Sequence, residues 1–374
     1  MHCAFLVIGG GIAGAGVAHA LAQTGDGRVV LLERESAPGY HSTGRSAALY
    51  TENYGNAPIR ALVQASKPFL LAPANNDAAH PVLTPRGALM IARADQGAAL
   101  DAALAFAGET GVAASEIDKA RALKLHPGLD PDYFARALYE PEAMDIDVHG
   151  LHQTFLKGLS ARGGTLVTDA EVTALARRDG LWHVDCRAGR YATPVVVNAA
   201  GAWADEIARL AGLRPVGLVP KRRTVVTFDP PDGADIAAWP MVIDVDENFY
   251  FKPDAGRLLA SPADETPVAP CDVQPEELDI ALAVDRFERA TTLRVRRITH
   301  KWAGLRTFAA DKTPVVGMAP DGPGFCWLAG QGGYGIQTAP ALSRVAAALA
   351  SGRPIPDDIA LDPAALAPER LLDG

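Results

Sequence analysis

A glycine-rich turn near the start of the chain has the residue types and spacing of a dinucleotide-binding motif. Gly9, Gly11 and Gly14 fit the pattern GxGxxG directly after an apolar run at residues 4–8. The first glycine of this pattern permits a tight turn, the second lets the backbone approach a pyrophosphate, and the third lets a helix close on the strand. Since the backbone N–H groups at a helix N-terminus bind anions, the turn predicts a pyrophosphate site.

A second apolar run, at residues 29–32, ends in an acidic residue, Glu33. A carboxylate at this position accepts hydrogen bonds from a ribose diol and disfavours a 2′-phosphate, so we expect an unphosphorylated adenosine. Arg34 beside it, and Ile12 and Ala13 at the start of the expected helix, complete this part of the predicted site. The order of strand, glycine turn, helix, strand and acid predicts one βαβ unit that binds a dinucleotide.

Two further segments favour FAD over NAD, although both cofactors share this fingerprint. Residues 39–48 combine small side chains, hydroxyls and an arginine, so they can run along a pyrophosphate and an isoalloxazine ring without bulk. The glycine-rich turn at residues 330–335 begins a helix whose N-terminus would stabilise negative charge on a reduced flavin. The remaining residues expected to bind the cofactor are His41, Ser42, Thr43, Arg45, Ser46, Ala47, Val172, Ala200, Gly201, Trp203, Gly332, Gly333, Tyr334, Gly335, Ile336 and Gln337.

The 374-residue chain is acidic and has an ordinary globular composition, with 35 basic and 44 acidic side chains and a formal net charge of −9. Because phosphate contacts need clustered Lys and Arg, this balance argues against nucleic-acid binding and favours small-molecule chemistry.

The four cysteines lie far apart, so we expect neither a metal site nor disulfides, as in a cytoplasmic protein. Glycines interrupt the apolar stretch 4–22, which predicts a strand, a turn and a helix instead of a transmembrane segment.

The elements that position these residues follow two patterns, which predict an α/β protein. Short apolar runs before helices indicate a Rossmann-like FAD-binding domain, and alternating strands with Pro-rich turns indicate an α+β substrate domain on a mostly antiparallel sheet. Helices are expected at about 13–23, 204–211, 276–290 and 338–350. The predicted FAD-binding domain comprises residues 1–82, 142–216 and 307–374, and the substrate-binding domain comprises residues 83–141 and 217–306.

Segments spread over nearly the whole chain resemble the FAD-dependent D-amino acid oxidase superfamily, which includes glycine oxidase, sarcosine oxidase and the D-amino acid dehydrogenases. They read VIGGGIAG, HSTGRSAA, VVVNAAGAW, FYFKPD, WAGLRTF and GQGGYGIQTAP, together with Glu33 and the basic run 221–223. Within the superfamily, the chain is most similar to bacterial D-arginine dehydrogenases. The resemblance implies non-covalent FAD and hydride transfer from a D-amino acid Cα to flavin N5. It also implies a 2-oxo acid and ammonia as products, and a quinone or another carrier as electron acceptor.

The resemblance also implies where the substrate binds. A planar guanidinium binds a carboxylate bidentately, and the resemblance places Arg223 and Arg306 in this role, with the phenol of Tyr250 beside them. Tyr54 lies on a segment that resembles a lid. No protein base is required, because solvent can accept the proton of the substrate amine. The implied substrate site comprises Arg223, Arg306, Tyr250, Tyr54, Leu49, Thr51, Gly87, Gly333 and Ile336.

Two departures from the arginine-preferring relatives bear on the substrate. The resemblance implies a Glu at the position of Gly87 and a His at the position of Leu49. Loss of a buried carboxylate costs a cationic ligand about 3–5 kcal/mol, so we expect neutral, apolar D-amino acids, unless an acid elsewhere in the fold replaces the missing Glu. Glycine, sarcosine or a 2-hydroxy acid as substrate remains an alternative, as does a flavin module that acts on a macromolecule.

Overall fold

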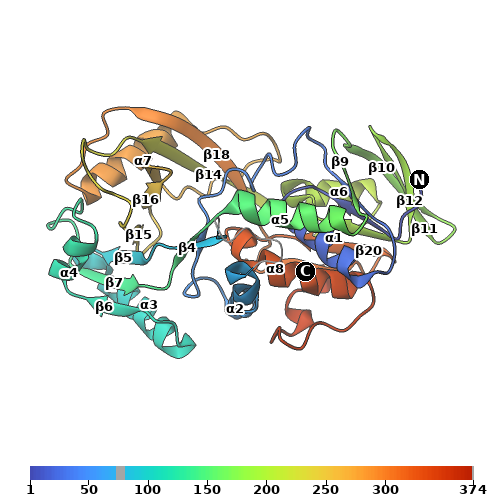
Figure 1. The fold of residues 1–374 in the computed structure, drawn as a ribbon, viewed down its shortest axis with the longest axis horizontal. Helices are drawn as coiled ribbons and strands as arrows, with labels where there is room; N and C mark the ends of the chain where they lie inside the picture. The colour runs from blue at the N-terminus through green and yellow to red at the C-terminus, as the bar shows by residue number, and fades with distance from the viewer. Residues whose placement is uncertain (73–80, 373–374) are drawn as a thin grey trace.

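Two sheets, each with its own covering layers, lie side by side along the long axis of the molecule (Figure 1). The computed structural model describes residues 1–72 and 81–372. The expected α/β class is confirmed: parallel strands alternate with helices in one half, and the other half is built on a larger mixed sheet. No helix within the described residues is long and apolar enough to cross a membrane.

The six-stranded sheet brings together strands from the beginning, the middle and the end of the chain. Its order is β19-β20-β13-β1-β2-β9, and all neighbours are parallel except β19 and β20. Central parallel strands are covered on both faces, which explains their continuous apolar sequences. The strands are β1 (Phe5–Ile8), β2 (Val29–Leu32), β9 (Thr165–Val167), β13 (Val195–Asn198), β19 (Val315–Met318) and β20 (Phe325–Ala329).

Alternate residues of these strands are buried in two different cores. Phe5 and Val7 pack with the helical layer, whereas Leu6 and Ile8 pack with the small three-stranded sheet on the other face. This follows from the two-residue side-chain period of a strand. The helical layer contains α1 (Ile12–Thr24), α2 (Ala57–Leu71), α5 (Val148–Ala161) and α8 (Gly335–Ala350), and the opposite layer contains α6 (Ala204–Leu210) with β10 (Val172–Arg178), β11 (Leu181–Cys186) and β12 (Gly189–Thr193).

The helices expected from the sequence are present, with small differences at their ends. The largest difference is at α8, which begins at Gly335 instead of residue 338, because the last glycine of the turn 330–335 already has helical geometry. The tail after Gly352 lies mostly on the surface. It also contributes to the core, since Leu366 is fully buried and its carbonyl accepts a hydrogen bond from the Val316 N–H. The tail carries two short 3₁₀ turns, at Pro363–Ala365 and Pro368–Leu371.

The eight-stranded sheet has the order β18-β14-β17-β16-β15-β5-β7-β6, and only β15 and β5 are parallel neighbours in the described chain. Helix α7 (Glu277–Ala290) packs on one face, and α3 (Gly97–Thr110) and α4 (Lys119–Leu125) pack near the β6 edge. The strands are β5 (Ala88–Ala92), β6 (Ser115–Ile117), β7 (Arg136–Glu140), β14 (Val219–Phe228), β15 (Met241–Asp244), β16 (Tyr250–Asp254), β17 (Arg257–Ser261) and β18 (Ile298–Phe308).

A small sheet joins the two halves of the molecule. Its order is β3-β8-β4, and its strands are β3 (Leu49–Tyr50), β4 (Leu83–Pro85) and β8 (Met144–Ile146). The face of the large sheet opposite α7 carries Val225, Tyr250 and Leu259, which pack with Ala47 from the loop after β2. The two halves therefore meet along this face.

Candidate functional site

A cavity of about 330 Å³ lies where the two halves meet and is lined by residues of both. The first half contributes the glycine turn after β1, the loop after β2, the residues after β13 and the turn before α8. The second half contributes β14, β16 and β18, which carry Arg223, Tyr250 and Arg306. The cavity thus joins a nucleotide-like end to an end with two guanidinium groups. Within the described residues, no cluster of His, Cys, Asp and Glu could hold a metal ion.

The turn after β1 needs glycine at two positions, because the backbone of neighbouring elements lies close to it. Gly9 has a φ of +105°, and a Cβ there would lie 2.5 Å from the Ala199 carbonyl oxygen. A Cβ at Gly14 would lie 1.8 Å from the Gly9 oxygen, so this glycine lets α1 pack against the turn. Glu33 lines the same end, and its carboxylate accepts hydrogen bonds from the backbone N–H groups of Gly10 at 2.8 Å and Glu35 at 2.9 Å. Burial raises the pKa of Glu33.

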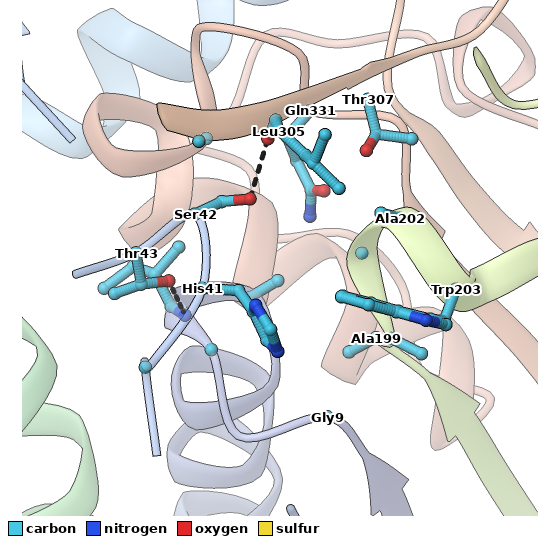
Figure 2. A pocket seen from close by; sticks show the side chains of 18 of the residues that line it. Gly9, His41, Ser42, Thr43, Ala199, Ala202, Trp203, Leu305, Thr307 and Gln331 are labelled. Carbon is cyan, nitrogen blue, oxygen red and sulfur yellow. Dashed lines mark hydrogen bonds between the residues drawn. The ribbon is translucent and has the colours of Figure 1, made fainter. Parts of the chain in front are cut away.

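The loop after β2 is tied to both halves by its hydroxyl and guanidinium groups. Ser42 donates to the Leu305 carbonyl at 2.7 Å, and Figure 2 marks this bond with a dashed line. Thr43 accepts a hydrogen bond from the Ile12 N–H at 2.9 Å. Arg45 donates to the Ala303 carbonyl at 3.0 Å and forms an ion pair with Asp272. These bonds hold residues 42–47 along the cavity wall.

Aromatic and charged side chains form one wall of the nucleotide end. Trp203 faces His41 with a ring-centroid distance of 4.7 Å, and both line the cavity (Figure 2). The Arg34 guanidinium lies 4.8 Å from the Trp203 ring, and His41 Nε2 lies 2.9 Å from a Glu35 carboxylate oxygen. This wall offers flat faces against which a planar ring system can stack.

Strand pairing brings the two arginines of the substrate end together. In the β14–β18 register Arg223 lies opposite Gly304, and Arg306 is two residues further along β18, so both side chains leave the same face of the sheet. The Arg223 guanidinium carbon lies 5.9 Å from the centre of the Tyr250 ring. Arg222, on the opposite face, instead forms an ion pair with Asp279 of α7, at 2.9 Å. Because successive side chains of a strand point to opposite faces, Arg222 has a structural role on one face, whereas Arg223 and Arg306 line the cavity on the other.

The two cavity arginines differ in how their charges are compensated. Arg223 donates to the Asp264 carbonyl at 2.9 Å and pairs with Glu265 at 3.2 Å. Arg306 forms no hydrogen bond or ion pair with any described residue, and its guanidinium lies against Gly333, where a Cβ would be 3.0 Å from Nη1. Burial, and then the positive charge of Arg306, lower the pKa of Arg223. An anion bound between the two groups would relieve this repulsion.

The segment that carries Thr51 and Tyr54 lies beside the cavity and does not line it. The Tyr54 ring packs against Tyr334, with centroids 4.7 Å apart, and its hydroxyl lies 3.5 Å from a carboxylate oxygen of Glu247. Burial raises the pKa of Tyr54. The Thr51 N–H donates to the side-chain oxygen of Gln337 in α8, at 3.0 Å.

Most of the predicted site residues line the cavity, and seven lie outside its lining. Leu49 packs with the apolar cluster around Tyr250. Gly87 has a φ of +73°, and a Cβ there would lie 2.7 Å from the Tyr139 hydroxyl oxygen, so this position suits glycine for conformational reasons. The predicted residues that do not belong to the cavity lining are Gly14, Leu49, Thr51, Tyr54, Gly87, Tyr334 and Gln337.

Several lining residues are missing from the sequence-based prediction. Those within the quoted motifs and segments could have been included, because neighbouring positions were. They are Ile8, Leu32, Gly39, Tyr40, Ala199, Ala202, Gly304, Leu305, Thr307 and Gln331. Val225 could have been found from its two-residue spacing from Arg223. No comparable local signal marks the others, which are Ala170, Glu171, Glu206, Ile207 and Leu210.

Comparison with known proteins places this geometry in a family. The model of the DAO family, described as FAD dependent oxidoreductase, matches residues 4–349. Mitochondrial sarcosine dehydrogenase of Mus musculus is 26% identical over 340 residues, which cover 86% of this chain and 36% of the mouse protein. The oxidoreductase YurR of Bacillus subtilis is 27% identical over 252 residues, 64% of each chain. The chain thus spans about a third of the length of the curated sarcosine dehydrogenases it matches.

Solved structures share the fold over nearly the whole chain. Glycine oxidase from Geobacillus kaustophilus superimposes with a TM-score of 0.84 at 22% identity, covering 98% of both chains. L-Proline dehydrogenase from P. horikoshii gives a TM-score of 0.83 at 22% identity, covering 99% of this chain and 98% of the other. The particular likeness to D-arginine dehydrogenases stays a prediction. The chain belongs to the DAO family of FAD dependent oxidoreductases, and FAD is its cofactor.

Proposed function

We propose that the protein is an FAD-dependent dehydrogenase that deaminates D-amino acids and favours neutral, apolar side chains. The observation that carries this proposal is the half-buried Arg306 guanidinium beside Arg223 in the cavity. It has no ion pair within the described chain, and a charge removed from water without a counterion is costly unless a ligand supplies one. The planar, bidentate geometry of a carboxylate suits such a pair of groups. The D stereochemistry rests on the sequence resemblance.

The same residues suggest how substrate and cofactor are arranged. The glycine turn and the N-terminus of α1 would hold the pyrophosphate of FAD, and Glu33 would hold its ribose. Residues 42–47 would hold its ring system. All of these groups line the cavity. Arg306, Arg223 and the Tyr250 phenol would fix the substrate carboxylate. When bound, FAD accepts a hydride from the substrate Cα. The imino product then hydrolyses in water to a 2-oxo acid and ammonia.

Non-covalent binding of FAD is part of the proposal. The four cysteines are Cys3, Cys186, Cys271 and Cys326, and none of them belongs to the described cavity lining. The substrate amine can lose its proton to water, so no side chain is assigned as a base. Electrons would pass on to a quinone or another carrier.

The preference for apolar side chains is supported by what surrounds the arginine pair. Val225, Met241, Leu259 and Leu49 form an apolar cluster with Tyr250 on this face of the sheet. The acidic residues that line the cavity are Glu33, Glu171 and Glu206, all in the FAD-side half of the cavity. Among the described residues no carboxylate lines the substrate end, since Glu265 pairs with Arg223 and Glu247 lies beside Tyr54. A cationic substrate side chain would therefore lose hydration without a lining counterion, which costs binding free energy.

The domain division predicted from the sequence also belongs to the proposal. All strands of the six-stranded sheet fall within residues 1–82, 142–216 and 307–374. The strands of the eight-stranded sheet fall within residues 83–141 and 217–306, except that β18 ends at Phe308. Residues 73–80 of the first part lie outside the described structure.

A second candidate function is oxidation of glycine or an N-methylated glycine. It is favoured by the similarity to mammalian sarcosine and dimethylglycine dehydrogenases. The arginine pair would bind these carboxylates equally well, so it does not distinguish the two candidates. They differ in whether the apolar cluster binds a substrate side chain. A 2-hydroxy acid is a further alternative that the same arginines would accept.

Steady-state turnover with an artificial electron acceptor tests the proposal. The substrate panel contains D-Leu, D-Met, D-Phe, D-Arg, L-Leu, glycine, sarcosine and D-lactate. We expect the highest kcat/KM with the apolar D-amino acids and a value for D-Arg at least about a hundredfold lower, in line with an unpaired buried charge. Preference for sarcosine or glycine would support the second candidate, and inactivity with every amine would refute amino-acid oxidation.

A further inference from the structure

Thr51, at the start of the segment that carries Tyr54, is hydrogen-bonded to both halves of the molecule. The Thr51 N–H donates to Gln337 Oε1 of α8, at 3.0 Å. Its hydroxyl donates to the carboxylate of Glu140 at the end of β7, 2.8 Å from Oε2 and 3.0 Å from Oε1. The same hydroxyl oxygen accepts the Asn53 N–H at 3.1 Å, so its single proton is directed to Glu140.

Glu140 is a buried acid that no cation of the described chain neutralises. Only 5% of its surface is exposed, and it forms no ion pair with any described residue. The nearby cation Lys67 of α2 instead pairs with Glu52 at 2.8 Å and with Glu142 at 3.5 Å. A buried carboxylate without a cation carries a large desolvation cost, so its hydrogen bond to Thr51 is its main compensation among the described side chains.

The contacts of Thr51 lead directly to the substrate end of the cavity. Gln337 follows Ile336, which lines the cavity. Tyr54, three residues after Thr51, packs on Tyr334 at the N-terminus of α8. Movement of the Thr51 anchor would therefore displace Tyr54.

We propose that Glu140 is a positioning residue: through Thr51 it holds the segment 51–56, and with it Tyr54, against the substrate end of the cavity. The consequence for activity rests on the proposed function: we expect Glu140 to affect substrate binding and not the hydride-transfer step. Glu140 itself touches neither the cavity nor the proposed position of the cofactor.

The ionisation of Glu140 gives the anchor a measurable pH dependence. Burial raises the pKa of Glu140 to about 7, whereas the Thr51 hydroxyl and the Glu52 N–H favour its ionised form. The charged groups that act on it are Glu52 and Glu142, both acidic, with Lys67 and the Tyr50 hydroxyl bound to Glu52. A carboxylate accepts a hydrogen bond more strongly than a neutral carboxyl group, so the anchor is stronger above pH 7.

Hydrogen exchange of the FAD-loaded enzyme tests the anchor without reference to any substrate. Thr51→Val removes the donor and Glu140→Ala the acceptor, and we expect exchange of the amides of residues 51–56 to become roughly tenfold faster in each. Thr51→Ser keeps the hydroxyl and should exchange like the wild type. Glu142→Gln is the matched control, because it removes a neighbouring exposed carboxylate that does not bind Thr51.

Ligand binding tests the positioning role. The probe is 4-methylpentanoate, which carries the carboxylate and side chain of leucine, has no amine to oxidise and stays ionised between pH 6 and 8. We expect its Kd for the wild type to fall as the pH rises through about 7, and Glu140→Gln to abolish this step. With an active amino acid, Thr51→Val should raise KM roughly tenfold and change kcat less than threefold.

The outcomes separate the two proposals. If the wild type neither binds 4-methylpentanoate nor oxidises an amino acid, the proposed function fails, while the exchange experiment still decides whether Glu140 holds the segment. Unchanged exchange in Thr51→Val and Glu140→Ala, or an equal change in Glu142→Gln, would overturn the positioning role. A pH step that persists in Glu140→Gln would also overturn it.

Discussion

At the scale of single residues, Arg306 carries the proposal for the substrate. It lies half-buried against Gly333 without a partner in the described chain, whereas Arg223 is already paired with Glu265. We expect Arg306→Lys to lower kcat/KM for the preferred amino acid by at least about a hundredfold, because a lysine cannot bind a carboxylate bidentately. The measurement is steady-state turnover at saturating FAD.

A matched arginine separates this effect from a general loss of charge. Arg178 is exposed on β10, far from the cavity lining, and Arg178→Lys should leave kcat/KM unchanged. An Arg306→Lys variant that binds FAD and retains full kcat/KM would show that Arg306 is not a carboxylate ligand.

A second residue-scale prediction concerns stability and not function. His126 is fully buried between Trp239 and Phe251, and neither ring nitrogen has a hydrogen-bond partner in the described chain. Burial lowers its pKa to about 4, below the ordinary value of 6.5. Between these values the unfolded chain binds more protons than the folded one, so folding stability falls as the pH falls through this window.

Replacement of this histidine should remove that part of the acid sensitivity. We expect the Tm of His126→Leu to decrease less than the Tm of the wild type between pH 7 and pH 5, as measured by circular dichroism. His183 is exposed on β11, so His183→Gln serves as the control: it removes an imidazole that is exposed and not buried. An unchanged pH dependence of Tm in His126→Leu would contradict the expectation.

At the scale of elements, two helix glycines with opposite surroundings test how α1 packs on the nucleotide turn. A Cβ at Gly14 would lie 1.8 Å from the Gly9 oxygen, whereas a Cβ at Gly108 in α3 would meet nothing within 4 Å. We expect Gly14→Ala to lower the free energy of unfolding by at least about 1–3 kcal/mol and to weaken FAD binding. Gly108→Ala should raise the free energy of unfolding by about 0.5–1 kcal/mol. Denaturant titration and FAD fluorescence measure both, and equal effects would contradict the packing role.

The elements also show which parts of the structure the sequence could predict. The βαβ unit from Phe5 to Leu32 was predicted closely, because its strands, turn and helix are specified by neighbouring residues. The juxtaposition of Arg223 and Arg306 depends on the β14–β18 register, which joins residues about eighty positions apart. Only the resemblance to known flavoproteins indicated it.

Other features were out of reach for the same physical reason. Glu140 ends an ordinary strand, and nothing near it in the sequence indicates that it will be buried beside Thr51. The hydrogen bond of Glu33 to Gly10 was likewise not predicted, since it depends on how β2 lies beside the turn. Long-range register and the burial of charged groups are properties of the assembled sheets.

At the scale of the whole molecule, the cofactor cavity is lined by residues of both halves. A ligand that binds only the folded state stabilises it by mass action, by about 2.7 kcal/mol when its concentration is a hundred times Kd. We therefore expect removal of FAD to lower Tm by several degrees, and re-addition to raise it in a concentration-dependent way. Differential scanning fluorimetry measures this, and a Tm that is independent of FAD would contradict the location of the site.

Anaerobic reduction of the bound flavin tests the central claim most directly, because it follows the reductive half-reaction without an electron acceptor. The FAD-loaded enzyme is mixed in a stopped-flow instrument with D-Leu, L-Leu, D-Arg, sarcosine or glycine, and the flavin absorbance near 450 nm is recorded. The account predicts fast bleaching by D-Leu and slow or no bleaching by L-Leu and D-Arg. Bleaching by L-Leu or sarcosine in preference to D-Leu, or by none of these amines, would contradict it.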